Sequence, residues 1–202
     1  MFNQHRLTTI LRQNGLYSLL DIGANSGEWA LQQIYDMPEL DIFCIEGNPE
    51  CENDLIATHL KYTMALLSDS CKEVKFYTNN LNSKCTGSSY YKEQSPHFTG
   101  EFKIFTTTTL DQLIDDKYDA IKIDTQGSEL DILRGGLNLL KSVKLICIET
   151  SLEEYNIGSP LDNEVDKFME SIGFKYHDIV GDSRYSDGRI FQEDRIYLCQ
   201  HQ

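Results

Sequence analysis

Four acidic residues stand at or near the ends of apolar, strand-like stretches of this 202-residue chain. In an open, mostly parallel α/β sheet, ligands bind in the crevice outside the carboxyl ends of the strands. Side chains at those ends come from distant parts of the chain and meet at one edge of the sheet. We therefore expect a ligand site built from carboxylates, which are Asp21, Glu46, Asp124 and Glu149.

The first of these acids opens a glycine-containing turn, D-I-G-A-N-S-G at residues 21–27, after the apolar run at residues 16–20. Glycine lets a turn adopt positive φ and lets the backbone lie against a ligand. The dinucleotide fingerprint G-x-G-x-x-G needs two later glycines and this turn has one, so the spacing disfavours an NAD-dependent oxidoreductase. Asp21 suits a ligand with a cationic, hydrogen-bond-donating part. The ammonium and sulfonium groups of S-adenosylmethionine provide such a part.

Glu46 lies about 20 residues beyond the glycine turn, where dinucleotide-binding folds place a carboxylate that accepts hydrogen bonds from ribose hydroxyls. The alternative is a solvated acid in the turn at residues 46–49. Because the glycine turn and the acid occur together at this spacing, we favour the ribose role for Glu46.

Lys122 lies in the stretch A-I-K-I-D at residues 120–124, where strand alternation puts it on the same face as Asp124. An unpaired ammonium group in a central strand would be costly, so we expect an acidic partner. We favour a structural ion pair with Asp21 or Glu149. The alternative is an ion pair that helps to place the oxygen of a substrate.

Strand-like and helix-like stretches alternate along the chain, which is typical of a doubly wound, Rossmann-like α/β sheet. We expect one domain spanning residues 1–202, which could also be one domain of a longer enzyme. The expected core strands are residues 16–22, 41–46, 62–67, 118–124 and 143–149. An added pair of strands is expected at residues 73–77 and 101–107.

Helices are expected at residues 1–13, 27–35 and 49–59 and from residue 128 to residue 140, where leucines recur at helical spacing. Thr109 has the spacing of a capping box for a short helix. A further helix should begin at Ser159 and Pro160 and end at Gly173. An antiparallel pair of strands at residues 174–180 and 194–199, joined by a polar loop, should form the C-terminal end.

The segment of residues 78–100 is too long for an ordinary connection, and such loops often bind ligands. Its hydroxyl-bearing and aromatic side chains suit a sugar; the alternative is a surface loop without a ligand. We combine it with Tyr185 and Arg189 of a second polar loop as the expected acceptor site. The side chains that motivate this prediction are Thr86, Ser88, Ser89, Tyr90, Tyr91 and Phe98.

The formal net charge of −14 and the pI near 4.7 disfavour nucleic acid and anionic membrane surfaces as partners. The six cysteines include no C-x-x-C pair, which disfavours a zinc site or a disulfide framework. Residues 1–14 lack the apolar core of a signal peptide. We therefore expect a cytoplasmic protein without a metal site, and the sequence leaves its oligomeric state open.

Several short motifs follow one another along the chain. They are D-I-G-A-N-S-G (residues 21–27), I-E-G-N-P (45–49), L-L-S-D (66–69), V-K-F-Y (74–77), T-T-L-D-Q-L (108–113), I-K-I-D-T-Q-G-S-E (121–129), L-R-G-G (133–136) and Q-E-D-R-I-Y (192–197). The first motif is shared with many methyltransferases, whereas the ordered set is more specific. With this set the chain resembles the FkbM-type S-adenosylmethionine-dependent O-methyltransferases from about residue 16 to residue 199.

The resemblance implies a seven-stranded class I methyltransferase sheet with S-adenosylmethionine along the glycine turn and adenine near Leu66. The family's motif usually reads D-V-E-G-x-E, whereas residues 124–129 of this chain read D-T-Q-G-S-E. Gln126 thus stands where the family has its second acid. A role that needs a charge there, such as Mg²⁺ binding, is therefore in doubt. The expected cofactor-binding residues are Asp21, Gly23, Ala24, Asn25, Gly27, Glu46, Asn48, Leu66 and Asp124.

Methyl transfer from a sulfonium to a hydroxyl is an in-line displacement. Alignment of the reactants can contribute on the order of 7–11 kcal/mol, whereas a general base typically adds about 10²–10⁴-fold. We expect Asp124 to be the base, with Glu149 as the second choice and Lys122 beside them. Cofactor contact alone is the alternative role for Asp124.

We therefore expect an S-adenosylmethionine-dependent O-methyltransferase that acts on a hydroxyl of a sugar or glycan, for example in a glycosylated metabolite. Two alternatives stay open besides the disfavoured oxidoreductase. One is a methyltransferase that acts on a small molecule other than a sugar. The other is a non-catalytic cofactor-binding partner in a glycan-assembly complex.

Overall fold

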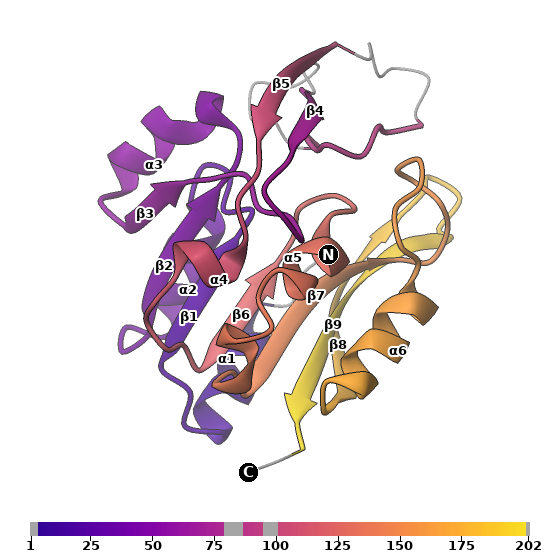
Figure 1. Ribbon diagram of the computed structural model, residues 1–202. Helices are drawn as coiled ribbons and strands as arrows, with labels where there is room; N and C mark the ends of the chain where they lie inside the picture. Colours follow the sequence, from indigo (N-terminus) through magenta and orange to yellow (C-terminus); the bar gives the residue numbers. More distant parts are fainter. Residues whose placement is uncertain (1–3, 79–86, 95–100, 201–202) are drawn as a thin grey trace.

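The computed structural model describes residues 4–78, 87–94 and 101–200. Its centre is a seven-stranded sheet in the order β3-β2-β1-β6-β7-β9-β8, in which β9 alone runs antiparallel to both of its neighbours. Figure 1 shows the sheet crossing the middle of the molecule. The strands are β1 (Ser18–Ile22), β2 (Asp41–Glu46), β3 (Lys61–Met64), β6 (Ala120–Ile123), β7 (Leu145–Ser151), β8 (Phe174–Arg184) and β9 (Ile190–Cys199).

Helices cover both faces of the sheet, as a doubly wound fold requires. One apolar core lies between the sheet and α4, α5 and α6, and a second lies between the sheet and α1, α2 and α3. Neighbouring strand residues alternate between the two, since Leu19 enters the second core and Leu20 the first. The helices are α1 (Gln4–Gln13), α2 (Glu28–Asp36), α3 (Glu52–Thr58), α4 (Leu110–Leu113), α5 (Glu129–Arg134) and α6 (Asp162–Ser171), with single 3₁₀ turns at Pro49–Cys51 and Leu139–Lys141.

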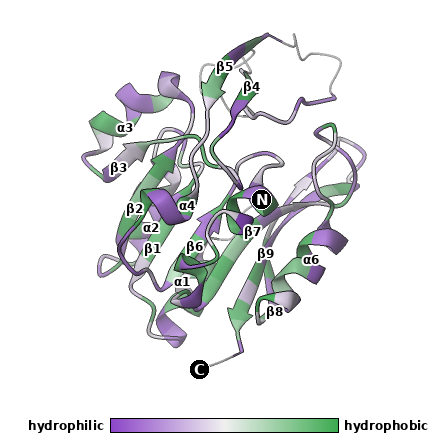
Figure 2. Cartoon of the chain, in the orientation of Figure 1, coloured by the Kyte–Doolittle hydropathy of each residue, from purple (hydrophilic) through white to green (hydrophobic). Residues whose placement is uncertain are grey.

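The central strands are buried on both faces and carry little polarity. All four residues of β6 are buried, and Lys122 is the one charged residue among them. Figure 2 shows the same trend as hydrophobic stretches along β1, β2, β6 and β7. The predicted α/β sheet in one domain is thus confirmed, and Lys122 is marked as an exception that needs a partner.

The strands β4 (Glu73–Tyr77) and β5 (Phe102–Thr106) form a separate antiparallel pair above the main sheet (Figure 1). This pair was predicted from the sequence and is confirmed. Thr109 also caps α4 as predicted, because its hydroxyl accepts a hydrogen bond from the backbone amide of Gln112 at 3.3 Å.

The helix predicted from residue 128 to residue 140 is wrong in its second half, because α5 ends at Arg134. A Cβ at Gly135 would lie 2.2 Å from the backbone oxygen of Ser68, so the chain passes too close to the loop after β3 for any side chain there. Beyond this contact the direction changes, and Leu137 is exposed. The leucine spacing that predicted one long helix therefore spans two separate elements.

The C-terminal strands are longer than predicted, because β8 reaches Arg184 and β9 begins at Ile190. The polar loop predicted at residues 181–193 is wrong, since most of it continues the antiparallel ladder, which has three register shifts. Cross-strand pairs such as Asp182 opposite Glu193 are polar because this end of the ladder is partly exposed. The real connection covers residues 185–189.

The predicted start of α6 is also wrong, because the helix begins at Asp162 and not at Ser159 or Pro160. A parallel bridge between Ser151 and Leu161 keeps this stretch extended. The Ser159 hydroxyl donates to the backbone oxygen of Asn156 at 2.8 Å instead of capping the helix. Among the described residues, no helix is both long and apolar enough to cross a membrane.

Candidate active site

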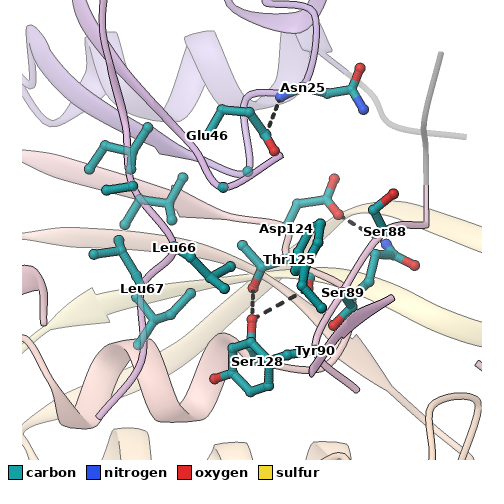
Figure 3. A pocket seen from close by; sticks show the side chains of 18 of the residues that line it. Asn25, Glu46, Leu66, Leu67, Ser88, Ser89, Tyr90, Asp124, Thr125 and Ser128 are labelled. Carbon is teal, nitrogen blue, oxygen red and sulfur yellow. Dashed lines mark hydrogen bonds between the residues drawn. The ribbon is translucent and has the colours of Figure 1, made fainter. Parts of the chain in front are cut away.

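A pocket with about 810 Å³ of empty space, including its open mouth, lies at the carboxyl ends of β1, β2 and β6. In Figure 3, Leu66 and Leu67 lie on one side of it, and Ser88 and Ser89 lie on the opposite side. The described lining includes two acidic side chains, Glu46 and Asp124, and no lysine, arginine or histidine. The pocket therefore favours a ligand with positive charge near its acidic groups.

The glycine turn forms one edge of the pocket because its backbone lies against β6. Gly23 has φ +81°, and a Cβ there would lie 1.9 Å from the backbone oxygen of Asp124. Asn25 also has a positive φ of 50°, and its side-chain oxygen accepts from the amide of Ser26 at 2.7 Å. Both Gly23 and Asn25, which the sequence predicted to bind a cofactor, line the pocket.

Two other residues of the turn lie outside the lining of the pocket. Ala24 is buried in the core on the side of α1 and α2. A Cβ at Gly27 would lie 3.1 Å from side-chain carbons of both Leu55 and Thr58, so Gly27 lets α2 pack against α3. These predicted cofactor residues support the turn and do not face the pocket.

Glu46 is held by two backbone amides. Its Oε2 accepts from the amide of Asn25 at 2.7 Å, and its Oε1 accepts from the amide of Asn48 at 2.7 Å. Burial raises the pKa of Glu46, and these hydrogen bonds act in the opposite direction. The side-chain oxygen of Asn48 accepts from the amide of Glu50 at 3.1 Å, so Asn48 positions Glu46 and does not line the pocket. Each carboxylate oxygen of Glu46 keeps a lone pair for a ligand.

Asp21 and Lys122 form a buried ion pair. The two residues are opposite each other on β1 and β6, and Lys122 Nζ lies 3.3 Å from Asp21 Oδ1. The structural pair predicted with Asp21 is therefore present, and the predicted alternative partner, Glu149, makes no ion pair with Lys122 among the described contacts. Asp21 is 0% exposed and lies beneath the pocket, so the direct cofactor contact expected of it is absent from the described lining.

Lys122 also serves a second acid. Its Nζ lies 3.3 Å from Asp124 Oδ2 and 5.0 Å from the centre of the Trp29 ring. Burial alone would lower the pKa of Lys122, but the carboxylates of Asp21 and Asp124 raise it above its usual value. Lys122 therefore stays charged and fixes Asp124, which lines the pocket.

The residue that departs from the resembled family joins the two predicted catalytic acids. Gln126 Nε2 donates to Asp124 Oδ1 at 3.1 Å and to Glu149 Oε2 at 2.8 Å. Gln192 Nε2 donates to the same oxygen of Glu149 at 3.0 Å. Asp124 and Gln126 line the pocket, and Glu149 lies outside its lining. Burial and the charges of nearby acids raise the pKa of Glu149 well above its usual value.

A buried acid that the sequence analysis missed fixes the turn between β6 and α5. Glu129 Oε1 accepts from the amide of Thr125 at 2.8 Å, and Glu129 Oε2 accepts from the amide of Gly127 at 2.9 Å. The acid in the first turn of α5 was visible in the sequence as a helix-start signal. Its role as an anchor for this turn depends on a side-chain direction that the sequence does not give.

The described part of the predicted binding loop, residues 87–94, is a strap across this end of the molecule. Ser89 pairs with Tyr77 at one end, and Glu93 pairs with Asn156 at the other. The hydroxyls of Tyr90 and Tyr91 both donate to Asp131 Oδ2, at 3.2 and 2.8 Å. The strap forms one wall of the pocket through Gly87, Ser88, Ser89 and Tyr90.

Tyr91, Tyr185 and Arg189 of the expected acceptor site are not in the described lining of the pocket. Thr86 and Phe98 lie outside the described residues. The guanidinium of Arg189 lies 4.6 Å from the centre of the Tyr185 ring and donates to Glu153 at 2.6 Å. Of the described chain, no group of three or more histidine, cysteine or acidic side chains could hold a metal ion.

Asp194 is a further acid that the sequence analysis missed, because residues 181–193 were expected to be a loop and β9 to begin only after it. It is opposite Glu149 in the pairing of β7 with β9. Burial and the nearby charge of Asp124 raise the pKa of Asp194 from 3.8 to about 7, and Lys122 opposes this shift.

The raised pKa makes stability depend on pH. Between pH 3.8 and about 7 the folded chain binds a proton at Asp194 that the unfolded chain has released, so this contribution to stability is lost as pH rises through about 7. We expect Asp194→Asn to raise the melting temperature more at pH 8 than at pH 5, as measured by circular dichroism. An equal change at both pH values would contradict the assignment. The exposed change Asp187→Asn is the matched control.

Residues 21–176 match the sequence profile of the Methyltransferase FkbM domain, which covers more than half of the chain. The chain belongs to the FkbM methyltransferase family. Methyltransferases of this family use S-adenosylmethionine, and the observed pocket fits that cofactor. Gly23 lets the turn lie against the backbone of Asp124 at the edge of the pocket, and Glu46 and Asp124 present negative charge to a cationic group.

Several solved structures with the same fold are methyltransferases. An FkbM methyltransferase from Methylobacillus flagellatus KT has a TM-score of 0.56 and 16% identity, over 91% of this chain and 43% of that protein. A TehB-like SAM-dependent methyltransferase from Corynebacterium glutamicum ATCC 13032 has a TM-score of 0.51 and 10% identity, over 99% of this chain and 89% of that protein.

The mitomycin 7-O-methyltransferase MmcR has a TM-score of 0.51 and 13% identity, over 98% of this chain and 53% of that protein. At these identities the similarity concerns the fold. The chain spans less than half the length of the FkbM methyltransferase that it matches. A comparison with curated protein sequences found no match.

Proposed function

We propose that this chain is an S-adenosylmethionine-dependent O-methyltransferase whose acceptor is a hydroxyl of a sugar or glycan. The observation that carries the proposal is the pocket itself, in which the described charged lining residues are the acids Glu46 and Asp124. S-adenosylmethionine carries a sulfonium and an ammonium group. NAD carries a negatively charged pyrophosphate, which the two acids would repel. The described lining holds no cationic side chain that could offset this repulsion.

The two sides of the pocket support separate places for cofactor and acceptor. Leu66 and Leu67 offer an apolar surface suited to adenine, beside Glu46, which suits the ribose hydroxyls (Figure 3). Ser88, Ser89 and Tyr90 on the strap offer hydroxyl and aromatic groups, which suit a sugar. Asp124 lies between these two sides (Figure 3).

Bound S-adenosylmethionine supplies an electrophilic methyl group, and the chain has to align an acceptor oxygen with it. Asp124 is the lining residue suited to accept the hydroxyl proton, because Lys122 and Gln126 fix its two oxygens. Holding the reactants in line can supply on the order of 7–11 kcal/mol of the barrier. We therefore assign the larger share of catalysis to positioning by the glycine turn, Glu46 and the strap.

Cofactor binding is tested by calorimetry with S-adenosylmethionine and NAD. We expect the first to bind, and we expect Glu46→Ala to weaken that binding by about 1–3 kcal/mol, because ribose hydroxyls would lose their acceptor. Glu46→Gln keeps the size and one oxygen and should lose less. Binding of NAD without binding of S-adenosylmethionine would contradict the proposal.

Acceptor chemistry is tested by mass spectrometry after incubation with labelled S-adenosylmethionine and a panel of glycosides, phenols and polyketide alcohols. Label on a sugar hydroxyl supports the proposal. Label on another class identifies a methyltransferase for a non-sugar molecule. Cofactor binding without label transfer to any member would favour the non-catalytic partner in a glycan-assembly complex.

A further inference from the structure

The turn between β6 and α5 holds Gln126 in an unusual backbone conformation. Gln126 has φ +58°, in the left-handed region that residues with a side chain rarely adopt. Glu129 binds the backbone amides of the residues on both sides of it, Thr125 and Gly127. A Cβ at Gly127 would lie 2.8 Å from Cβ of Ser159, so the turn is also pressed against the segment after β7. Such conformations gather at functional sites, where the surroundings hold them in place.

The conformation aims one amide group at two acids. A side-chain amide nitrogen carries two hydrogens, and here one is donated to Asp124 Oδ1 at 3.1 Å and the other to Glu149 Oε2 at 2.8 Å. Both acids must therefore present a lone pair to Gln126. Asp124 is fixed at its other oxygen by Lys122, and Glu149 receives a second donor from Gln192.

The surroundings of this amide are poor in positive charge. In the described part of the chain, Lys122 is the one lysine that faces the acids, and a glutamate at position 126 would add a negative charge that Lys122 cannot balance. Glutamine instead donates to both carboxylates without changing the net charge. Among the described residues, the titratable and charged groups around Asp124 and Glu149 are Asp21 on β1, Lys122 on β6, Glu129 on α5, Cys147 on β7, Tyr155 after β7 and Asp194 on β9.

We propose that Gln126 is a positioning residue that holds Asp124 and Glu149 apart as two separate hydrogen-bond acceptors, with Asp124 lining the pocket and Glu149 behind it. Its catalytic meaning rests on the proposed methyl transfer. As the oxygen–carbon bond to the acceptor forms and the carbon–sulfur bond breaks, the hydroxyl proton passes to a carboxylate oxygen of Asp124, which must be ionised to receive it. Gln126 supports that state by donating to the Asp124 carboxylate and by lying between it and Glu149, so that the two acids do not share a proton.

The network is tested without cofactor or acceptor by carboxyl ¹³C NMR titration of aspartate-labelled and glutamate-labelled protein. Asp124→Asn and Glu149→Gln assign the two signals. We expect Gln126→Glu to move the midpoints of both Asp124 and Glu149 to higher pH, by about one unit or more, because carboxylates that share a site cannot all ionise together. Gln126→Met, which removes the donors without adding charge, should move both midpoints in the same direction by less.

Two further variants separate positioning from general disturbance. Gln192→Glu should raise the midpoint of Glu149 and leave Asp124 nearly unchanged, because Gln192 donates to Glu149. Gln94→Glu is the matched control, since the amide of Gln94 donates to the carboxylate of Glu154 at 3.0 Å on the exposed surface. We expect it to leave the titrations of both Asp124 and Glu149 unchanged.

Unchanged midpoints of Asp124 and Glu149 in folded Gln126→Glu and Gln126→Met would overturn the proposal. If Gln126→Glu fails to fold, the midpoints measured in Gln126→Met decide whether the proposal stands. In a methyl-transfer assay, Gln126→Glu should lose activity at neutral pH and regain it at higher pH, whereas a purely structural defect would lower it at every pH. Because the titration needs no ligand, it is independent of whether the wild-type chain binds S-adenosylmethionine.

Discussion

Asp124→Asn is expected to lower kcat for methyl transfer by about 10²–10⁴-fold while the affinity for S-adenosylmethionine is mostly retained. Asparagine keeps the size of the side chain and one oxygen, but it cannot take up the proton of an acceptor hydroxyl. Lys122 is ion-paired with both Asp21 and Asp124, and Asp124→Asn leaves Asp21 as the carboxylate of these two. Steady-state kinetics with a saturating acceptor, together with calorimetry of the cofactor, measures both quantities.

Glu149→Gln is the matched comparison for Asp124→Asn, since Glu149 accepts from the same amide of Gln126 but lies outside the lining of the pocket. We expect a smaller loss of kcat from this change. Near-normal kcat in Asp124→Asn with abolished turnover in Glu149→Gln would move the base to β7. Weaker cofactor binding with little change of kcat at saturation would instead limit Asp124 to cofactor contact.

Gly23→Ala is expected to abolish measurable cofactor binding and to lower the melting temperature strongly. The new methyl group would lie 1.9 Å from the backbone oxygen of Asp124, and the ends of β1 and β6 would have to separate to admit it. The positive φ of Gly23 adds roughly 1–2 kcal/mol for a residue with a Cβ. Thermal denaturation followed by calorimetry with S-adenosylmethionine tests this expectation.

Gly188→Ala separates the cost of the positive φ from the cost of the steric clash with a neighbouring backbone. Gly188 has φ +88°, but a Cβ there meets nothing within 4 Å. It should therefore show the backbone cost alone, with cofactor binding unchanged. Suppose that Gly23→Ala and Gly188→Ala lose the same stability and that both variants bind the cofactor. The close approach of Gly23 to Asp124 would then not explain why the turn needs a glycine there.

Much of the site could be predicted because the alternation of side chains along a strand is a local property. The alternation in β6 placed Lys122 beside Asp124, and the neighbouring strand supplied Asp21 at the same level. The spacing of Glu46 from the glycine turn placed it in the pocket. These predictions needed only the period of a strand and the rule that ligands bind at the carboxyl ends.

The predictions failed where distant segments decide the local structure. The sequence around Arg134 continues a helical pattern, but the close passage of Gly135 against Ser68 ends the helix. Asp21 precedes a ligand-type turn, yet its side chain faces inward because Lys122 needs a buried partner. The bridge made by Gln126 depends on a left-handed backbone conformation that glutamine rarely adopts.

The position of β9 between β7 and β8 sets the order in which the protein can be assembled. A ribosome adds roughly 5–20 residues per second from the N-terminus, so β7 and β8 are both made before the strand that joins them. Until β9 docks, one edge of β7 is open to pairing with another chain, which favours aggregation. Gln192 and Asp194 arrive on this strand. A nascent chain therefore completes the glycine turn and Glu46 early, and it completes the acidic end of the site last.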